Sequence, residues 1–211
     1  ALFTALRNTA PVSRPDTEPT PKQNANLSFF EAYFSNFIEG TEFEIEEAMD
    51  VVFNGKIPQD RPQDAHDILG TYRVVADRQD MAALPHDFEH FIEILCRRHH
   101  AVMESRPDRL PGQFKLKTNR AGSTVFVEPD LVLGTLEKGY GFYTGLETPL
   151  YLAVYMMFLV SEVHPFVDGN GRTARIMMNA ELVAGQEQKI IIPIIYRNNY
   201  LSALKAMTHN G

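Results

Sequence analysis

One short segment of the chain combines residue types that could transfer a phosphorus-centred group. It reads His164-Pro165-Phe166-Val167-Asp168-Gly169-Asn170-Gly171-Arg172-Thr173-Ala174-Arg175. An imidazole is partly unprotonated at neutral pH, so His164 could act as a base. Beside a polyphosphate, the carboxylate of Asp168 could hold Mg²⁺, which takes one or two carboxylates and completes its coordination with phosphate oxygens and water.

The same segment predicts a binding site for phosphate. Pro165 disfavours helical geometry at the residue before it, so one helix should end at His164. The turn Gly169-Asn170-Gly171 should then open the next helix, because its glycines permit left-handed backbone and close approach. The free N–H groups and the positive dipole end of that helix would point at one anion.

Two arginines extend this anion site. Arg172 and Arg175 lie three residues apart, which predicts that they share one face of the new helix. Their forked guanidinium groups suit phosphate oxygens, so both could meet the outer phosphates of one ligand. A base, a metal-binding acid, an anion site and two arginines together predict transfer of a phosphorus-centred group to a hydroxyl.

Other sites of similar composition do not fit this spacing. A P-loop needs Gly-Lys followed by Ser or Thr, whereas Gly171 is followed by Arg172 and Thr173. An EF-hand loop starting at Asp168 would carry Arg172 at its fifth position, which does not suit calcium. An ordinary turn remains the alternative for any one of these residues alone, and Phe166 is interpreted as an apolar anchor in the core.

The composition is that of a globular protein that does not span a membrane. The chain has 211 residues, of which 44% are hydrophobic and 22% charged, and a net charge of −7 argues against general nucleic-acid binding. Its one cysteine, Cys96, excludes an internal disulfide, which favours a reducing, cytoplasmic location. No stretch reaches the roughly 20 apolar residues of a membrane span. The chain does not begin with methionine, so it could be part of a longer protein.

Helices should position the segment. Residues 1–26 contain Pro11, Pro15, Pro19 and Pro21 and predict an extended leader, and residues 27–211 predict one domain. Apolar periodicity and capping signals predict helices over 27–37, 41–54, 63–78, 85–105, 129–143, 149–163, 171–185 and 198–207. In the second of these, Thr41 and Glu44 would form a capping box. His99 lies beside Arg97 and Arg98 and is expected at the polar end of its helix.

One segment departs from this helical pattern. Two strand-like runs, 114–117 and 124–127, flank the turn-forming residues Asn119-Arg120-Ala121-Gly122. They predict a β-hairpin over about 113–127. The expected fold class is therefore all-α with one small hairpin.

The catalytic segment resembles the signature of the Fic family, His-Pro-Phe-x-Asp/Glu-Gly-Asn-Gly-Arg-x-x-Arg, at every defined position. The resemblance extends from about Leu27 to the end of the chain, with helices, hairpin and signature in the family's order. It implies the Fic fold and a protein adenylyltransferase that moves AMP from ATP to a protein hydroxyl and releases pyrophosphate. The hairpin at 113–127 matches the flap that aligns the target segment by strand pairing.

The resemblance also implies a role for each matched residue. His164 would deprotonate the Ser, Thr or Tyr hydroxyl of the target protein, and Asp168 would bind Mg²⁺. The remaining matched positions would hold the phosphates of ATP, namely Gly169, Asn170, Gly171, Arg172 and Arg175.

A second motif resembles the family's inhibitory sequence, Ser/Thr-x-x-x-Glu-Gly/Asn. It is Ser35-Asn36-Phe37-Ile38-Glu39-Gly40, at the end of a predicted helix over about 27–40. The carboxylate of Glu39 would pair with Arg175 and place negative charge where the γ-phosphate belongs. Some inhibited Fic proteins also remove AMP, with the glutamate positioning water.

Several functions stay open on the sequence alone. They are removal of AMP, transfer of another nucleotide or phosphoryl group, and a non-catalytic regulator of the toxin–antitoxin kind. The presence of His164 beside a complete anion-binding loop favours catalysis, since a binding module needs no base there. The target protein, the choice of base and the oligomeric state, including a homo-oligomer, are not decided by the sequence.

Overall fold

The structure is a computed structural model that describes residues 1–210, with side chains as far as Thr208. Its helices are α1 (Leu2–Arg7), α2 (Pro21–Ile38), α3 (Ile45–Asn54), α4 (Pro62–Ala76), α5 (Arg78–Ala82), α6 (Phe88–Met103), α7 (Val132–Tyr143), α8 (Pro149–Val163), α9 (Asn170–Ala184) and α10 (Arg197–Asn210). The strands β1 (Arg120–Ala121) and β2 (Thr124–Val125) form a two-stranded antiparallel sheet. The expected all-α class with a small hairpin is confirmed.

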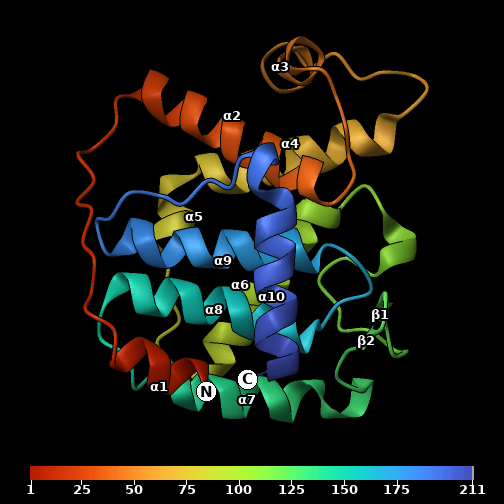
Figure 1. The fold of residues 1–211 in the computed structure, drawn as a ribbon. Helices are drawn as coiled ribbons and strands as arrows, with labels where there is room; N and C mark the ends of the chain where they lie inside the picture. Colours follow the sequence, from red (N-terminus) through yellow and green to blue (C-terminus); the bar gives the residue numbers. More distant parts are fainter. Residues whose placement is uncertain (211) are drawn as a thin grey trace.

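Helices α8 and α9 lie side by side at the centre of the fold (Figure 1). Thr148 caps α8 by accepting a hydrogen bond from the Tyr151 N–H, and Pro149 occupies the first turn. The main core joins these two helices to α6 and α7, and its fully buried members include Phe91, Leu136 and Met156. This packing makes the α8–α9 connection, residues 164–169, a loop fixed at both ends.

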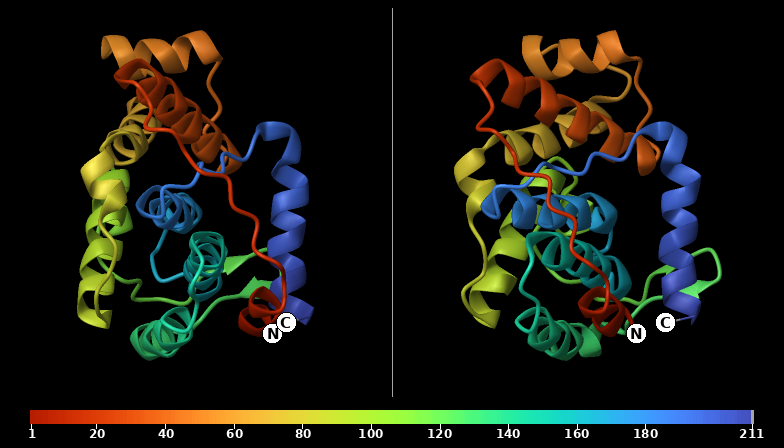
Figure 2. Two further views of the ribbon diagram at one scale, coloured as in Figure 1. Left: turned by 90° about the vertical axis from the view of Figure 1, so that its left-hand side faces the viewer. Right: turned by 60° about the vertical axis from the view of Figure 1, so that its left-hand side comes forward.

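The second half of α2 lies along α9, with α3 and α4 beside α2 (Figures 1 and 2). It packs on α4 through an apolar cluster that contains Phe29, Tyr33 and Ile68. Helix α10 lies in front of α8 and α9 in Figure 1 and crosses both at a steep angle. The end of α2, the start of α9 and one face of α10 therefore meet in one place.

The N-terminal leader is less extended than the sequence suggested. Residues 2–7 form α1, because Leu2, Phe3 and Leu6 pack on the main core, and α2 begins at Pro21 instead of residue 27. Only the intervening stretch is extended, and there Pro15 forms an isolated β-bridge with Glu187. The domain expected over 27–211 therefore has contacts with the leader; its last residue, 211, lies outside the described part.

The predicted capping box at Thr41 is wrong. Helix α3 begins at Ile45, its N-cap is Glu44, and no side chain caps it. The chain instead runs non-helically through Phe43, which is 4% exposed and whose carbonyl accepts a hydrogen bond from Tyr33. Burial of one aromatic side chain thus overrides a local capping signal.

The predicted hairpin is confirmed in place but is shorter than expected. Arg120 pairs with Val125 and Ala121 with Thr124, and one further backbone hydrogen bond, from the N–H of Phe126 to the carbonyl oxygen of Asn119 at 3.2 Å, extends the pairing.

Within the described residues, none of the helices has the length and apolar character that a membrane crossing requires.

Candidate active site

The loop between α8 and α9 has a backbone that the sequence pattern specifies. His164 ends α8 in the left-handed conformation, with φ 51° and ψ 57°, and Pro165 prevents the helix from continuing. Gly169 (φ 73°) is the N-cap of α9, where an added Cβ would lie 2.7 Å from the Met103 sulfur. Phe166, between them, is fully buried, which confirms its expected role as an anchor.

The imidazole of His164 is held as one neutral tautomer. Its Nδ1 lies 3.2 Å from the carbonyl oxygen of Ser161, which can only accept, so Nδ1 carries the hydrogen and Nε2 is the unprotonated nitrogen. Burial lowers the pKa of His164 to about 4, so the ring is neutral at pH 7. Phe126 stacks on the ring, with centroids 3.8 Å apart and planes 7° apart. His164 therefore has the form that a base needs.

A cavity of about 190 Å³ opens beside His164. One end is lined by Glu39, His164, Gly171 and Arg175, which come from α2, the loop and α9. Phe126, which stacks on His164, and Tyr200, whose ring lies under the Arg175 guanidinium, flank this group. Further apolar lining comes from α8 and α10, with Phe158, Leu201 and Leu204. The cavity is thus polar where the sequence predicted phosphate and apolar farther along α10.

The first turn of α9 leaves no spare space at this polar end. A Cβ on Gly171 would lie 2.1 Å from Oε1 of Glu39. The side chain of Asn170 is buried, and it both accepts from the N–H of Phe166 and donates to its carbonyl, each at 2.9 Å. Asn170 therefore shapes the loop through its side chain, and only its main chain faces the helix terminus.

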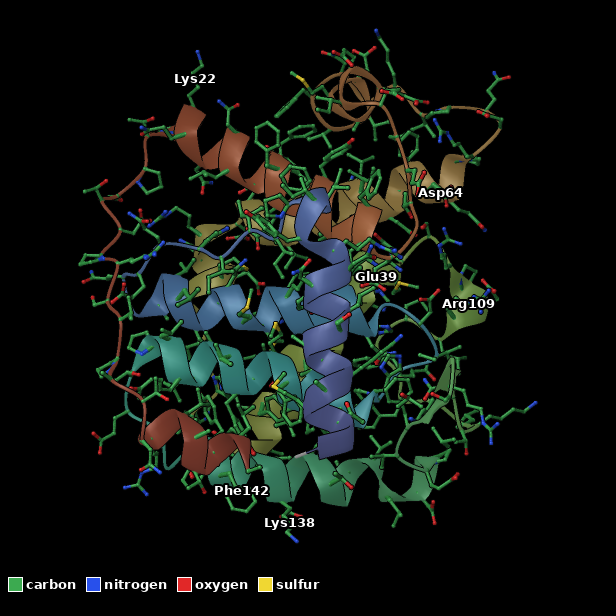
Figure 3. The ribbon with its side chains drawn as sticks, viewed as in Figure 1. Lys22, Glu39, Asp64, Arg109, Lys138 and Phe142 are labelled. Carbon is green, nitrogen blue, oxygen red and sulfur yellow. The ribbon has the colours of Figure 1, made fainter. Side chains whose placement is uncertain are left out.

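Arg175 meets the residues of the predicted inhibitory motif. Its Nη2 lies 2.7 Å from Oε1 of Glu39 and 2.8 Å from the carbonyl oxygen of Ser35, and its Nε donates to the Ser35 hydroxyl at 2.9 Å. The Arg175 side chain is 6% exposed and that of Glu39 34%. In Figure 3, Glu39 lies where the end of α2 faces α9 and α10.

The two arginines of the signature do not converge. Arg172 does not line the cavity; its Nη1 lies 2.9 Å from Asp67 Oδ2 and 3.2 Å from Asn36 Oδ1. Asp67 is 1% exposed and also accepts from Arg106 at 2.8 Å. Arg172 thus joins α9 to α2 and α4, a long-range pairing that the i, i+3 spacing alone did not predict.

A row of polar contacts, called the α2–α9 seam below, connects these two helices. Besides Arg175 with Ser35 and Glu39, and Arg172 with Asn36, it contains a hydrogen bond of 2.8 Å from Asn179 to Glu31. Lys189 also pairs with Glu31 at 2.8 Å. The segment from Ser35 to Glu39, predicted to be inhibitory, is therefore the end of a longer polar interface.

Asp168 is compatible with a metal site completed by substrate. Its side chain is 44% exposed; Oδ1 accepts from the N–H of Gly169 at 2.6 Å and lies 3.8 Å from Arg172. Across the residues that the structure describes, no group of three or more His, Cys, Asp and Glu side chains gathers to hold a metal. A single exposed carboxylate fits Mg²⁺ that takes its other ligands from phosphate and water.

His99 is a buried part of this site, contrary to the expectation of a polar helix end. It stacks on Phe166 with ring centroids 3.6 Å apart, accepts from the N–H of Gly112 at 2.9 Å and so donates from Nε2 to the carbonyl oxygen of Asp168 at 3.0 Å. Burial lowers the pKa of His99 to about 4. The sequence did contain a sign of this burial, because His99 lies four residues after Leu95 and therefore on the same, buried face of the helix.

Known proteins share this fold. The chain superimposes over its whole length on a Caenorhabditis elegans structure, "Fic-1 (aa134 - 508)", with a TM-score of 0.75 and 19% identity, covering 62% of that chain. A Fic domain-containing signaling protein from Bacteroides thetaiotaomicron gives a TM-score of 0.73 at 18% identity over 97% of this chain and 78% of that one. At these identities the likeness concerns the fold.

Curated relatives match a shorter part of the chain. "Protein adenylyltransferase Fic" of Drosophila persimilis is 40% identical over 57 residues, which are 27% of this chain and 11% of that protein. The Drosophila melanogaster protein of the same name is also 40% identical over 57 residues and is covered to 12%. The matched region is thus about a ninth of the length of these relatives.

The family comparison covers the site itself. The model of the Fic/DOC family matches residues 62–182, more than half of the chain, from α4 through the signature loop and most of α9. The loop geometry, the fold and this match agree, and the chain belongs to the Fic/DOC family.

Proposed function

We propose that this chain is a protein adenylyltransferase that moves AMP from ATP to a hydroxyl of a target protein and is inhibited by its own Glu39. The observation that carries the proposal is that His164, Gly171 and Arg175 line the polar end of one cavity. A base and an anion-binding helix terminus are thereby brought to the same ligand.

The polar end would take the phosphates of ATP. The main chain of Gly169, Asn170 and Gly171 opens α9, so its N–H groups and helix dipole favour negative charge there. Arg175 would bind the γ-phosphate once Glu39 leaves it, and Arg172 would support the helix terminus from behind. The apolar walls from α8 and α10 suit the nucleoside.

His164 would supply the base. The target hydroxyl loses its proton to Nε2, its oxygen attacks the α-phosphorus, and the bond from this phosphorus to the bridging oxygen breaks as pyrophosphate leaves. Asp168 would hold Mg²⁺, which when bound neutralises phosphate charge. The hairpin, whose Ala121 and Thr124 line the cavity, would pair with an extended target segment.

Glu39 would keep the site inactive. Its carboxylate pairs with Arg175 and also occupies the space beside Gly171. A Cβ placed on Gly171 would lie only 2.9 Å from the carboxyl carbon of Glu39. A triphosphate in that space would meet negative charge instead of a free guanidinium.

The same residue supports a second candidate, removal of AMP from a modified protein. Glu39 and His164 line one cavity, so the carboxylate could orient a water molecule for attack on a bound phosphodiester. In that reaction Glu39 would be required, whereas in transfer it inhibits.

Labelling with each of the four nucleoside triphosphates tests these proposals. The parental chain, Glu39→Gly and the double variant Glu39→Gly/His164→Ala are incubated with Mg²⁺, a labelled nucleotide and cell-lysate proteins as acceptors. We expect transfer of the label from ATP by Glu39→Gly and its loss in the double variant. If Glu39→Gly transfers no label from any nucleotide, the transferase proposal is wrong. Release of AMP from a labelled acceptor by the parental chain alone would favour the second candidate.

A further inference from the structure

We propose that Lys115 is a positioning residue that fixes the direction of the His164 imidazole. The proposal rests on the proposed function, in which His164 is the base. It concerns a residue at the start of the segment that carries the hairpin, outside the signature loop.

Lys115 binds the main chain on both sides of His164. Its N–H donates to the carbonyl oxygen of Pro165 at 2.9 Å, and its Nζ donates to the carbonyl oxygen of Val163 at 3.4 Å. Val163 is the last residue of α8, so the ammonium also neutralises the negative end of this helix. One side chain and its own backbone thus hold the residues before and after the histidine.

The neighbouring Asn119 completes this arrangement. Its Oδ1 accepts from Lys115 Nζ at 2.7 Å, and its Nδ2 donates to the carbonyl oxygen of Phe166 at 2.8 Å. This pair of residues therefore binds three carbonyl groups on the two sides of His164, one at the end of α8 and two in the loop, at positions 163, 165 and 166. The pair also joins the hairpin segment, which lines the target side of the cavity, to the catalytic loop.

His164 needs such support because its backbone is left-handed. A residue with a Cβ adopts φ 51° at a cost in free energy, and such a conformation persists where the surroundings hold it. Loss of the Lys115 ammonium would release the Val163 carbonyl and its own partner Asn119, which would let the loop relax and turn the ring away from Ser161. The unprotonated Nε2 would then no longer be directed consistently into the cavity.

Burial of Lys115 argues that its place is specific. The residue is 2% exposed, and burial lowers its pKa to about 8, so it is largely charged at pH 7. The charged and titratable groups that act on His164 are Lys115 from the hairpin segment, Glu39 from α2 and Asp168 from the loop. Burial and Lys115 lower the pKa of His164, whereas the two carboxylates raise it.

The test compares Lys115→Met, Lys115→Arg and the control Lys117→Met, each in the Glu39→Gly chain. Lys117 lies two residues away and is exposed. We expect Lys115→Met to lower kcat for labelling about 10- to 100-fold with KM for ATP within about twofold. The acid limb of its pH profile should move to higher pH, because a positive charge near His164 is gone. Lys115→Arg should recover much of the rate, and Lys117→Met should not change it.

Nitrogen NMR of the His164 ring gives a readout independent of activity, with His164→Ala to assign its signals. At pH 7.5 the parental chain should show the Nδ1-protonated tautomer, and Lys115→Met should show a mixture of tautomers with a raised pKa. An unchanged tautomer and pKa in a folded Lys115→Met would overturn the proposal, as would an equal loss of rate in Lys117→Met. If Lys115→Met does not fold, Asn119→Ala, which removes the partner of the ammonium, carries the same readouts. If Glu39→Gly/His164→Ala still transfers the label, the proposed role of His164 as the base is wrong. The NMR result then decides separately whether Lys115 orients the His164 ring.

Discussion

Removal of the Glu39 carboxylate should destabilise the chain and at the same time strengthen its binding of ATP. The change is Glu39→Ala, which deletes the partner 2.7 Å from the guanidinium of Arg175. Breaking a fully buried ion pair by deleting one partner costs roughly 3–5 kcal/mol. Here a third of the Glu39 side chain is exposed, and Ser35 still accepts from Arg175, so the free energy of unfolding should fall by about 1–2 kcal/mol.

Thermal unfolding followed by circular dichroism measures this change. For a chain of this size, a loss of about 1–2 kcal/mol corresponds to a Tm lower by about 2–8 °C. Addition of ATP and Mg²⁺ should then raise the Tm of Glu39→Ala more than that of the parental chain, because a ligand that binds more tightly stabilises the folded state more at the same concentration. Glu42→Ala, which removes an exposed carboxylate three residues away, is the matched control and should follow the parental chain.

The opposite signs of the two effects make the result decisive. A variant that was merely damaged would have a lower Tm and weaker binding, whereas release of Arg175 predicts a lower Tm and tighter binding. Equal Tm values and equal responses to ATP in Glu39→Ala and the parental chain would refute the inhibitory contact.

Three further results are expected. Gly171→Ala should lower Tm in the parental chain and much less in Glu39→Gly, since its Cβ would lie 2.1 Å from the Glu39 carboxylate; a double-mutant cycle with additive effects would contradict this steric reasoning. Burial raises the pKa of Glu181 from 4.5 to about 7, so the stability it contributes when protonated is lost as pH rises between these values. The free energy of unfolding, measured with urea, should therefore fall between pH 5 and pH 8 by up to about 3 kcal/mol less in Glu181→Gln than in the parental chain. An equal fall in both chains would contradict this prediction. Phe126→Ala should raise the pKa of His164, because it uncovers a ring whose pKa is lowered mainly by burial; NMR titration checks this.

The site could be located from the sequence because its signals are local. The order His164-Pro165, followed by Gly169, specifies a helix end, a turn and a new helix within a few residues, and the structure has this order. The pairing of Glu39 with Arg175 is a long-range contact, and it was accessible only through the resemblance of two motifs to one family.

Other parts of the site depend on partners that no local pattern names. Nothing near Asp67 in the sequence indicates that it binds Arg172, and His99 looked polar because of its charged neighbours although its helical spacing places it inside. The leader was expected to be extended because of its prolines, yet Phe3 and its neighbours find apolar surface on the core and fold as α1.

The α2–α9 seam has a consequence for how the helix can move. An apolar interface tolerates small slips, because one carbon surface replaces another at little cost. In the seam, a shift of one residue would leave Glu31, Arg172 and Arg175 buried without their partners, and each such charge is expensive to leave unpaired. Intermediate registers are therefore disfavoured, so the α2–α9 seam should break as a unit when it is perturbed and should not slide by one residue.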